Sequence, residues 1–190
     1  MENQEQRSIL LEQGVESWNT WRVGAPRVAP DLSGIDLNGR DLTGVNFWSA
    51  NLSGANLKGA NLTQATLLRA NLRGAQLEGA LLQDADLLGA DLSEANLEEA
   101  DLRDALLTGV TLQRTNLQRA VLHGANLRGA SMRDTDARHA DLRNTRLTLV
   151  RMEGARMIGA QIEGLQIHPA QAQLLATALG VEILTDRKSG

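Results

Sequence analysis

The sequence contains no cysteine, which excludes disulfide bonds and thiolate metal ligands. Aromatic residues make up only 2% of the chain and there are 3 prolines, yet 42% of the residues are hydrophobic. A core almost without rings must be filled by aliphatic side chains, and protein interiors are packed as densely as solids. This combination favours a regular repeat over an irregular globular core.

Two kinds of segment are also missing. Residues 1–7 are polar and acidic, unlike the basic and then apolar start of a signal peptide. No apolar run approaches the length that crosses a bilayer, so no membrane association is expected. The net charge of −4 is small, and direct binding to nucleic acid is not expected either. We therefore expect a cytoplasmic protein.

What the sequence does contain is a five-residue repeat that keeps its phase from Leu32 to Ile167. The central position is Leu in 21 of the 28 repeats, and the position two before it is Ala in 18 of them. A period of five is neither helical nor that of a flat strand, so we expect the chain to turn a corner every five residues. The large and the small residue then point inward, and the other three positions face solvent.

The last position of the repeat is Gly in 14 of the 28 copies. A type II turn requires positive φ at its third residue, which Gly adopts without a steric penalty. Where another residue stands there, we expect a different turn type, as at Arg69, Glu94, Glu99 and Arg119.

Stretches such as 50–54 (Ala-Asn-Leu-Ser-Gly) and 55–59 (Ala-Asn-Leu-Lys-Gly) follow the pattern A(D/N)LXX. With this repeat over 140 of its 190 residues, the chain resembles the pentapeptide-repeat family. The resemblance implies an all-β solenoid, a right-handed quadrilateral β-helix with four repeats per coil. Residues 30–169 would then form seven coils.

The two ends of such a rod need covers, because each coil buries its leucines only against its neighbours. Residues 1–29 carry apolar side chains at roughly helical spacing, which predicts an N-terminal helical cap. Residues 170–190 follow Pro169 and contain Gly180, which predicts a C-terminal helix and a tail. Arg40 stands at an inward position of the first coil, and we expect it to bend out or to bond the cap.

The resemblance also implies an oligomeric state. Members of the family often pair through their C-terminal helices. A homodimer would then form through the leucines of that helix, Leu174, Leu175 and Leu179.

The outward side chains fall on four faces, which we name after the central residue of each side of the first coil: Leu32, Leu37, Leu42 and Phe47. The Phe47 face carries an apolar column at successive coils, formed by Trp48, Leu68 and Leu88, with Leu106 beside it. Contiguous exposed apolar area marks an interaction site. The alternative for Trp48 is that the N-terminal segment folds over it.

Charge is also uneven along the rod. Residues 90–109 carry a net charge of −5, and residues 110–129 carry +3. One interpretation is that neighbouring coils pair these opposite charges along the ladder. The other is a bipolar docking surface for a protein partner, formed by Glu94, Glu98, Glu99, Asp101, Asp104, Arg114 and Arg119.

The chain shows no catalytic, metal or cofactor motif. His123, His139 and His168 fall on different faces or distant coils, and the glycines do not form a phosphate-binding loop. A convex rod without an insertion also offers no pocket for a substrate. We therefore expect a non-enzymatic rod without cofactors that serves as an interaction or regulatory scaffold for an unknown protein partner.

The resemblance supplies a second hypothesis. The family includes rods that imitate duplex DNA, bind type II topoisomerases (DNA gyrase and topoisomerase IV) and protect against quinolones. Such mimicry needs a negative potential along the whole rod. Only the Leu42 face approaches it, with outward side chains that sum to −4, and nine arginines lie between 114 and 156. The DNA mimic therefore ranks second.

Overall fold

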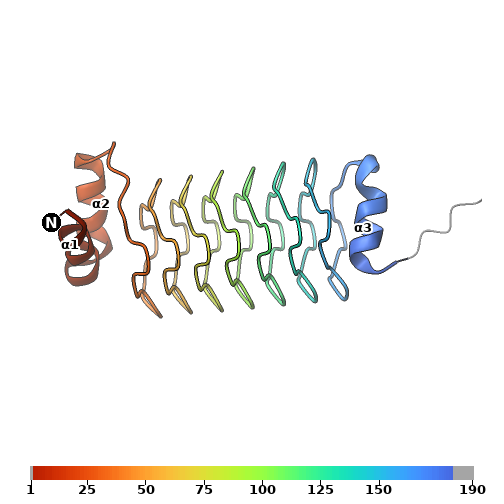
Figure 1. Ribbon diagram of the computed structural model, residues 1–190, viewed down its shortest axis with the longest axis horizontal. Helices are drawn as coiled ribbons and strands as arrows, with labels where there is room; N and C mark the ends of the chain where they lie inside the picture. Colours follow the sequence, from red (N-terminus) through yellow and green to blue (C-terminus); the bar gives the residue numbers. More distant parts are fainter. Residues whose placement is uncertain (1, 182–190) are drawn as a thin grey trace, which may run out of the picture.

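The structure is a computed structural model, and it describes residues 2–181. Figure 1 shows a row of stacked coils with helices at both ends. At the N-terminal end lie α1 (Glu2–Ser8), the short π-helix η1 (Ile9–Gln13) and α2 (Gly14–Gly24). At the C-terminal end lie the short 3₁₀ turn η2 (Pro169–Gln171) and α3 (Ala172–Leu179).

The coils are held together by a parallel ladder. Bridges join each residue before a repeat centre to the residue 20 positions later, from Asp31 with Asn51 to Arg146 with Gln166. Since 20 residues contain four repeats, each coil has four sides. The side chains on one side of successive coils therefore form columns along the rod. Each coil contributes one rung to a column, and neighbouring rungs are about 4.8 Å apart.

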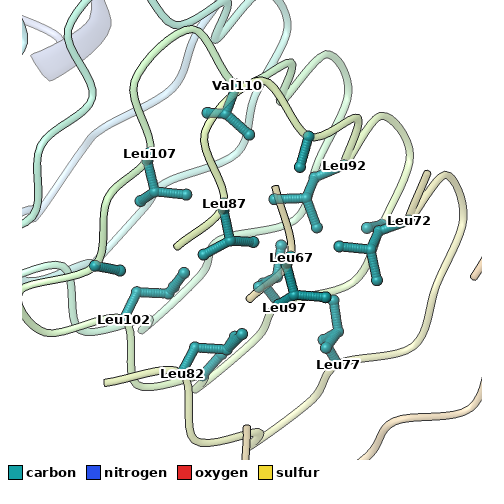
Figure 2. Packing of buried hydrophobic residues seen from close by; sticks show 14 of the residues in the cluster. Leu67, Leu72, Leu77, Leu82, Leu87, Leu92, Leu97, Leu102, Leu107 and Val110 are labelled. Atoms are coloured by element: carbon teal, nitrogen blue, oxygen red, sulfur yellow. The ribbon is translucent and has the colours of Figure 1, made fainter. Parts of the chain in front are cut away.

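The inside of the rod is filled as the repeat predicts. The central leucines and the alanines two residues before them are buried along its length, as at Leu97 and Ala95. Figure 2 shows leucines from successive coils stacked on one another around the axis. Inward sides with one large and one small residue in most repeats thus fill the core, and Phe47 is the one aromatic ring among the repeat centres.

The expectation of a second turn type at corners without Gly is wrong. Arg69, Glu94, Glu99 and Arg119 all have positive φ, between 56° and 62°, as the glycine corners do. The turn hydrogen bond is also kept, since the Ala70 amide donates to the Leu67 carbonyl at 3.0 Å. The reason is the ladder: the Arg69 amide donates to the Leu88 carbonyl at 3.0 Å, which holds this residue in the left-handed region despite its side chain.

The preference for Asp or Asn before each centre has a local cause. The carboxylate of Asp31 accepts a hydrogen bond from the Ser33 amide at 3.0 Å, and the Asn96 side chain accepts one from the Glu98 amide at 3.2 Å. This is an Asx turn, in which a short side chain replaces a backbone acceptor. Leu106 and Leu81 stand at the same repeat position and have no such oxygen.

The helices α1 and α2 lie against the open first coil (Figure 1). In later coils the outer carbonyls accept bonds from the preceding coil, as the Asn51 carbonyl does from the Leu32 amide at 2.7 Å. The first coil has no preceding coil, and side chains of the helices supply the donors instead: Trp18 to the Asn46 carbonyl at 2.8 Å, Arg22 to Trp48 at 2.8 Å and Arg7 to Ser33 at 2.6 Å.

Two further contacts join the N-terminal segment to the first coil, and the second meets the expectation for Arg40. The Trp18 ring is buried and meets the Phe47 ring edge to face, with 5.8 Å between the centroids. Arg40 is exposed, and its guanidinium donates to the Leu11 carbonyl at 3.1 Å, so it bonds the N-terminal segment and does not enter the stack.

At the other end, α3 lies over the last coil. The Ala178 carbonyl accepts a hydrogen bond from the Met157 amide at 2.7 Å, and the buried Gln171 side chain donates to the Val150 carbonyl at 2.7 Å. Leu175 is only 8% exposed and belongs to the core, because its side of α3 faces the rod. The expectation of Leu175 as a dimer contact is therefore wrong for this chain.

Candidate interaction surface

The structure places the predicted apolar residues on one face. Trp48, Leu68 and Leu88 occupy successive rungs, because the Ser49 amide donates to the Leu68 carbonyl at 2.9 Å and the Arg69 amide donates to the Leu88 carbonyl at 3.0 Å. Leu106 follows on the next rung, where its carbonyl accepts from the Leu87 amide at 2.9 Å. These four residues form what we call the apolar column.

The exposure of the apolar column increases away from the N-terminus. Trp48 and Leu68 are half-buried, whereas Leu88 is 43% exposed and Leu106 is 47% exposed. The Arg22 guanidinium lies 5.9 Å from the centre of the Trp48 ring. The N-terminal segment therefore does contact Trp48, as the alternative interpretation expected, and it leaves the two distal leucines open.

The predicted charged residues are brought together in pairs. Glu94 accepts hydrogen bonds from Arg114 at 2.5 Å and from Arg73 at 2.8 Å, so it joins three coils of the Leu32 face. On the Leu37 face, Arg119 binds both Glu98 and Glu99. The acidic and the basic coils thus neutralise each other along the ladder.

The Leu42 face is paired in a different way. The Arg103 guanidinium lies 2.6 Å from the carboxylate of Asp101, which stands two positions earlier in the same coil. Arg143 and Asp141 repeat this arrangement, also at 2.6 Å. Burial acts to raise the pKa of Asp101, but the hydrogen bonds from Arg103 outweigh it and hold the pKa below its usual value. Asp104 forms no ion pair within residues 2–181.

Asp136 on the Leu37 face is the most buried of the ion-paired carboxylates in the described chain. It is 7% exposed and accepts hydrogen bonds from Arg138 at 2.7 Å and from Arg156 of the next coil at 2.7 Å. The hydrogen bond from Arg138 is the main reason that the pKa of Asp136 lies below its usual value, and burial opposes it. Three of the four faces therefore bond their own charged side chains.

The Phe47 face differs from the other three. Over the described residues of this face, no side chain forms an ion pair or a hydrogen bond with another side chain. Its side-chain oxygens accept only from backbone amides, as Asn46 does from Trp48 at 3.1 Å and Asp86 does from Leu88 at 3.0 Å. It also carries Arg128 and Arg146, exposed and without ion-pair partners in the described chain.

Those two arginines were missed as site residues. A signal for them exists in the sequence, since the ladder places residue i beside residues i−20 and i+20. For Arg128 these neighbours are Thr108 and Thr148, and for Arg146 they are Asn126 and Gln166. Arginines of the rod also pair with an acid two residues earlier, as Arg103 does, or 21 residues away, as Arg73 does. Arg128 and Arg146 have no acid at any of these spacings, so they are expected to be unpaired, but the rule requires the coil length to be known.

The structure contains shallow hollows. One lies on the N-terminal helices and is lined by Ile9, Gln13, Glu16, Ser17, Thr20 and Trp21. Another lies on the Leu37 face and is lined by Glu78, Gly79, Glu98 and Glu99. Within residues 2–181, no three acidic, His or Cys side chains are grouped so as to hold a metal ion. In the same range, no helix has the length and apolarity to span a membrane.

The geometry agrees with the comparisons with known proteins. The model of the Pentapeptide repeats family matches in 8 copies, over residues 31–67, 70–109, 105–144 and 130–164. Among curated protein sequences there is no match.

Solved structures of pentapeptide repeat proteins are similar to this chain. HetL, involved in heterocyst differentiation regulation in the cyanobacterium Nostoc sp. strain PCC 7120, is 32% identical, with 73% of this chain and 68% of that chain covered and a TM-score of 0.36. QnrB1, a plasmid-mediated fluoroquinolone resistance protein, is 24% identical, with 82% and 86% covered and a TM-score of 0.37. A pentapeptide repeat protein from the thylakoid lumen of Arabidopsis thaliana is 31% identical, with 77% of each chain covered and a TM-score of 0.20.

The repeat, the 20-residue ladder and the match of the family model over most of the chain lead to one conclusion. This chain belongs to the pentapeptide repeat family and adopts its right-handed β-helix fold.

Proposed function

We propose that this protein is a non-enzymatic interaction scaffold that binds a protein partner through the Phe47 face. The observation that carries the proposal is the contrast between faces: three of them bond their polar side chains to one another, and the Phe47 face does not. Its side chains keep their capacity for contacts with another molecule.

The apolar column supplies the candidate centre of the contact. Leu88 and Leu106 lie on neighbouring rungs and are both exposed by more than 40%. Leu106 also stands where many other repeats have Asp or Asn. It therefore lacks the Asx-turn hydrogen bond from the backbone amide two residues later, and it exposes an apolar side chain instead. Contiguous apolar surface of this kind is typical of protein interaction sites.

The charge boundary between residues 90–109 and 110–129 is a weaker candidate. Arg114 and Arg119 are engaged by Glu94, Glu98 and Glu99, and a partner would have to break those pairs before it could use them. The ladder interpretation of these charges is therefore preferred. Asp104 is the member of the predicted set that carries an unpaired charge within the described residues.

The DNA mimic stays the second hypothesis. The acidic Leu42 face still offers Asp84 and Asp104 on neighbouring coils, but Asp101 and Asp141 are each bonded to an arginine of the same face. This alternation interrupts the continuous negative potential that mimicry of a duplex requires. Binding of purified DNA gyrase or topoisomerase IV to the immobilised rod would reverse the ranking.

Two subordinate proposals concern its state in the cell. We also propose that the protein acts in the cytoplasm. A homodimer through α3 would now depend on Leu174, which is 37% exposed, and on the half-buried Leu179. Light scattering of the protein and of Leu174→Glu tests this, and an unchanged monomer mass in both would exclude the dimer.

The proposed function is tested by affinity capture from a host lysate with three baits: the protein itself, Leu88→Ser/Leu106→Ser and the matched control Leu81→Ser. Leu81 occupies the same repeat position as Leu106 and is 39% exposed, but it lies on the Leu42 face. We expect a partner that the protein and the control retain and the double variant loses. Equal recovery by all three baits would exclude the Phe47 face as the docking surface.

A further inference from the structure

The arginines of the rod fall into two groups. Of the nine between residues 114 and 156, six form ion pairs with Asp or Glu: Arg114, Arg119, Arg133, Arg138, Arg143 and Arg156. Arg128, Arg146 and Arg151 form none within the described residues, and all three are exposed. In the N-terminal half of the rod, Arg40 and Arg69 are also exposed and form no ion pair within the described residues, so three of the five such arginines of the rod lie in its C-terminal half.

Two of these three arginines share a face with the apolar column. Arg128 stands in the column of Trp48, Leu68 and Leu88, two rungs beyond Leu88. Arg146 stands in the column of Leu106, two rungs beyond it, as the bridges from Leu106 to Asn126 and from Asn126 to Arg146 show. Along the rod, these two columns thus change from mainly apolar, with Asp86 among the leucines and Arg69 at the neighbouring corner, to basic.

We call these two columns, from Trp48 to Arg146, the strip. The edge of the strip is open to an approaching chain. Gly89, Gly109 and Gly129 follow one another at the corner next to Leu88, Thr108 and Arg128. No atom lies within 4 Å of the place that a Cβ would take at Gly109 or Gly129. The bare corner lets a bound chain lie close to the backbone along these rungs.

We infer that the Phe47 face binds an extended or helical segment of a protein partner that is apolar at one end and acidic at the other. The apolar end would lie over Leu88 and Leu106, and the Asp or Glu side chains would bond Arg128 and Arg146. The inference rests on the proposed function and narrows the partner's chemistry. From the rung of Trp48 to that of Arg146 the strip spans about 24 Å, the length of roughly 16 helical residues.

The dimensions favour a peptide segment over two other anionic partners. The strip is two side-chain columns wide, and its apolar and basic parts follow one another along the rod. A bilayer surface would have to meet both parts at once across a broad area. A nucleic acid would contact many phosphates, whereas the face offers Arg69, Arg128 and Arg146 against Asp86.

The inference is tested by selection from a random peptide-display library, with peptides of about 16 residues matched to the strip. The baits are the protein, Arg128→Gln/Arg146→Gln and Leu88→Ser/Leu106→Ser. Arg138→Gln is the matched control, because it removes an arginine at the repeat position of Arg128 on the Leu37 face and leaves Asp136 bonded to Arg156. Vesicles with and without phosphatidylserine form a separate arm.

We expect the selected peptides to combine apolar residues with an excess of Asp and Glu. Their affinity, measured by fluorescence anisotropy, should fall about tenfold in the double arginine variant, because two exposed ion pairs are lost. The control should bind normally, and raising the salt concentration should weaken binding to the protein more than to the double arginine variant.

Three results would overturn the inference. Peptides without an acidic excess, or equal affinity for the protein and the double arginine variant, would refute the acidic end. If such peptides still lost affinity for Leu88→Ser/Leu106→Ser, the proposed function would stand and the inference alone would fall. Binding to phosphatidylserine vesicles without any peptide selected would assign the face to a membrane surface and refute both.

Discussion

The Leu37 face and the Phe47 face follow the same inward pattern of the repeat and differ mainly in their outward side chains. Both bury a leucine at the repeat centre in most coils. Outside, the Leu37 face bonds its own charges, with Lys58 on Glu78 at 2.5 Å and Asp136 between two arginines, whereas the Phe47 face carries leucines and unpaired arginines. The repeat therefore specifies the fold through two of its five positions, and the other three are free to give each face a separate character.

The largest effect is expected inside the rod, where the two faces should be equivalent. Leu97 and Leu107 are both fully buried centres, one on each face, and Figure 2 shows both within the stack. Replacing either with Ala should lower the free energy of unfolding by about 2–5 kcal/mol, because the rigid coils close poorly over a cavity. Urea denaturation measures both values. A difference well beyond the uncertainty of the fits would show that the inside also distinguishes the faces.

A smaller effect is expected from the ion pairs of the Leu37 face. Because the pKa of Asp136 is lowered in the folded protein, the folded state binds fewer protons than the unfolded state. Its stabilisation is therefore full above the ordinary Asp pKa of about 3.9 and is lost as pH falls through the lower folded value.

The variant Arg138→Gln/Arg156→Gln should consequently lower Tm by a few degrees at neutral pH, and the difference from the protein should shrink as the pH falls below about 4. Thermal melts between neutral and strongly acidic pH provide the measurement. A Tm difference that stayed constant over this range would show that the pairs with Asp136 do not stabilise the fold.

Substitutions at a corner with Gly and at a corner without Gly should change the free energy of unfolding in opposite directions. Gly109 has a φ of 67°, so Gly109→Ala should cost about 1 kcal/mol. Gln64 has a φ of 58°, so Gln64→Gly should stabilise the protein. The gain should be smaller than the cost of Gly109→Ala, because Gly also increases the entropy of the unfolded chain. Chemical denaturation of both variants gives the two signs. Destabilisation of the rod by Gln64→Gly would contradict the strain assigned to these corners.

The smallest effect on stability is expected from the apolar column. Leu88→Ser/Leu106→Ser removes exposed apolar surface and no side-chain bond, so the free energy of unfolding should change by less than about 0.5 kcal/mol per site. The control Leu81→Ser should behave in the same way. A large loss of stability would mean that these leucines pack against the rod and are not available to a partner.

The inside of the rod could be predicted from the sequence because an unbroken five-residue period determines which positions face inward. Leu32 and Met157, near the two ends of the repeat, are both fully buried. The corners at Arg69 and Glu99 could not be predicted from residue preference, because the ladder bonds of the neighbouring coil hold them at positive φ. In this fold the register between coils overrides the local preference of a single residue.

The apolar column could be found from the sequence, since Trp48, Leu68 and Leu88 recur at the coil length and Leu106 falls on the same face. The charge pattern was harder to interpret, because summing charges by coil separates Glu94 from Arg114, which lie on neighbouring rungs and bond to each other. The donors of the N-terminal helices could not be foreseen either. That Trp18 and Arg22 bond carbonyls of the first coil depends on how α2 is placed on the rod.

The most direct test of the central claim is carbene footprinting of the protein with and without a captured partner. The label reacts with exposed side chains on all four faces, so each face is an internal control for the others. We expect reduced labelling at Leu88 and Leu106, with unchanged labelling at Leu81 and Ile158 on the Leu42 and Leu37 faces. Protection of Leu81 or Ile158 while Leu88 and Leu106 stay fully labelled would contradict this claim.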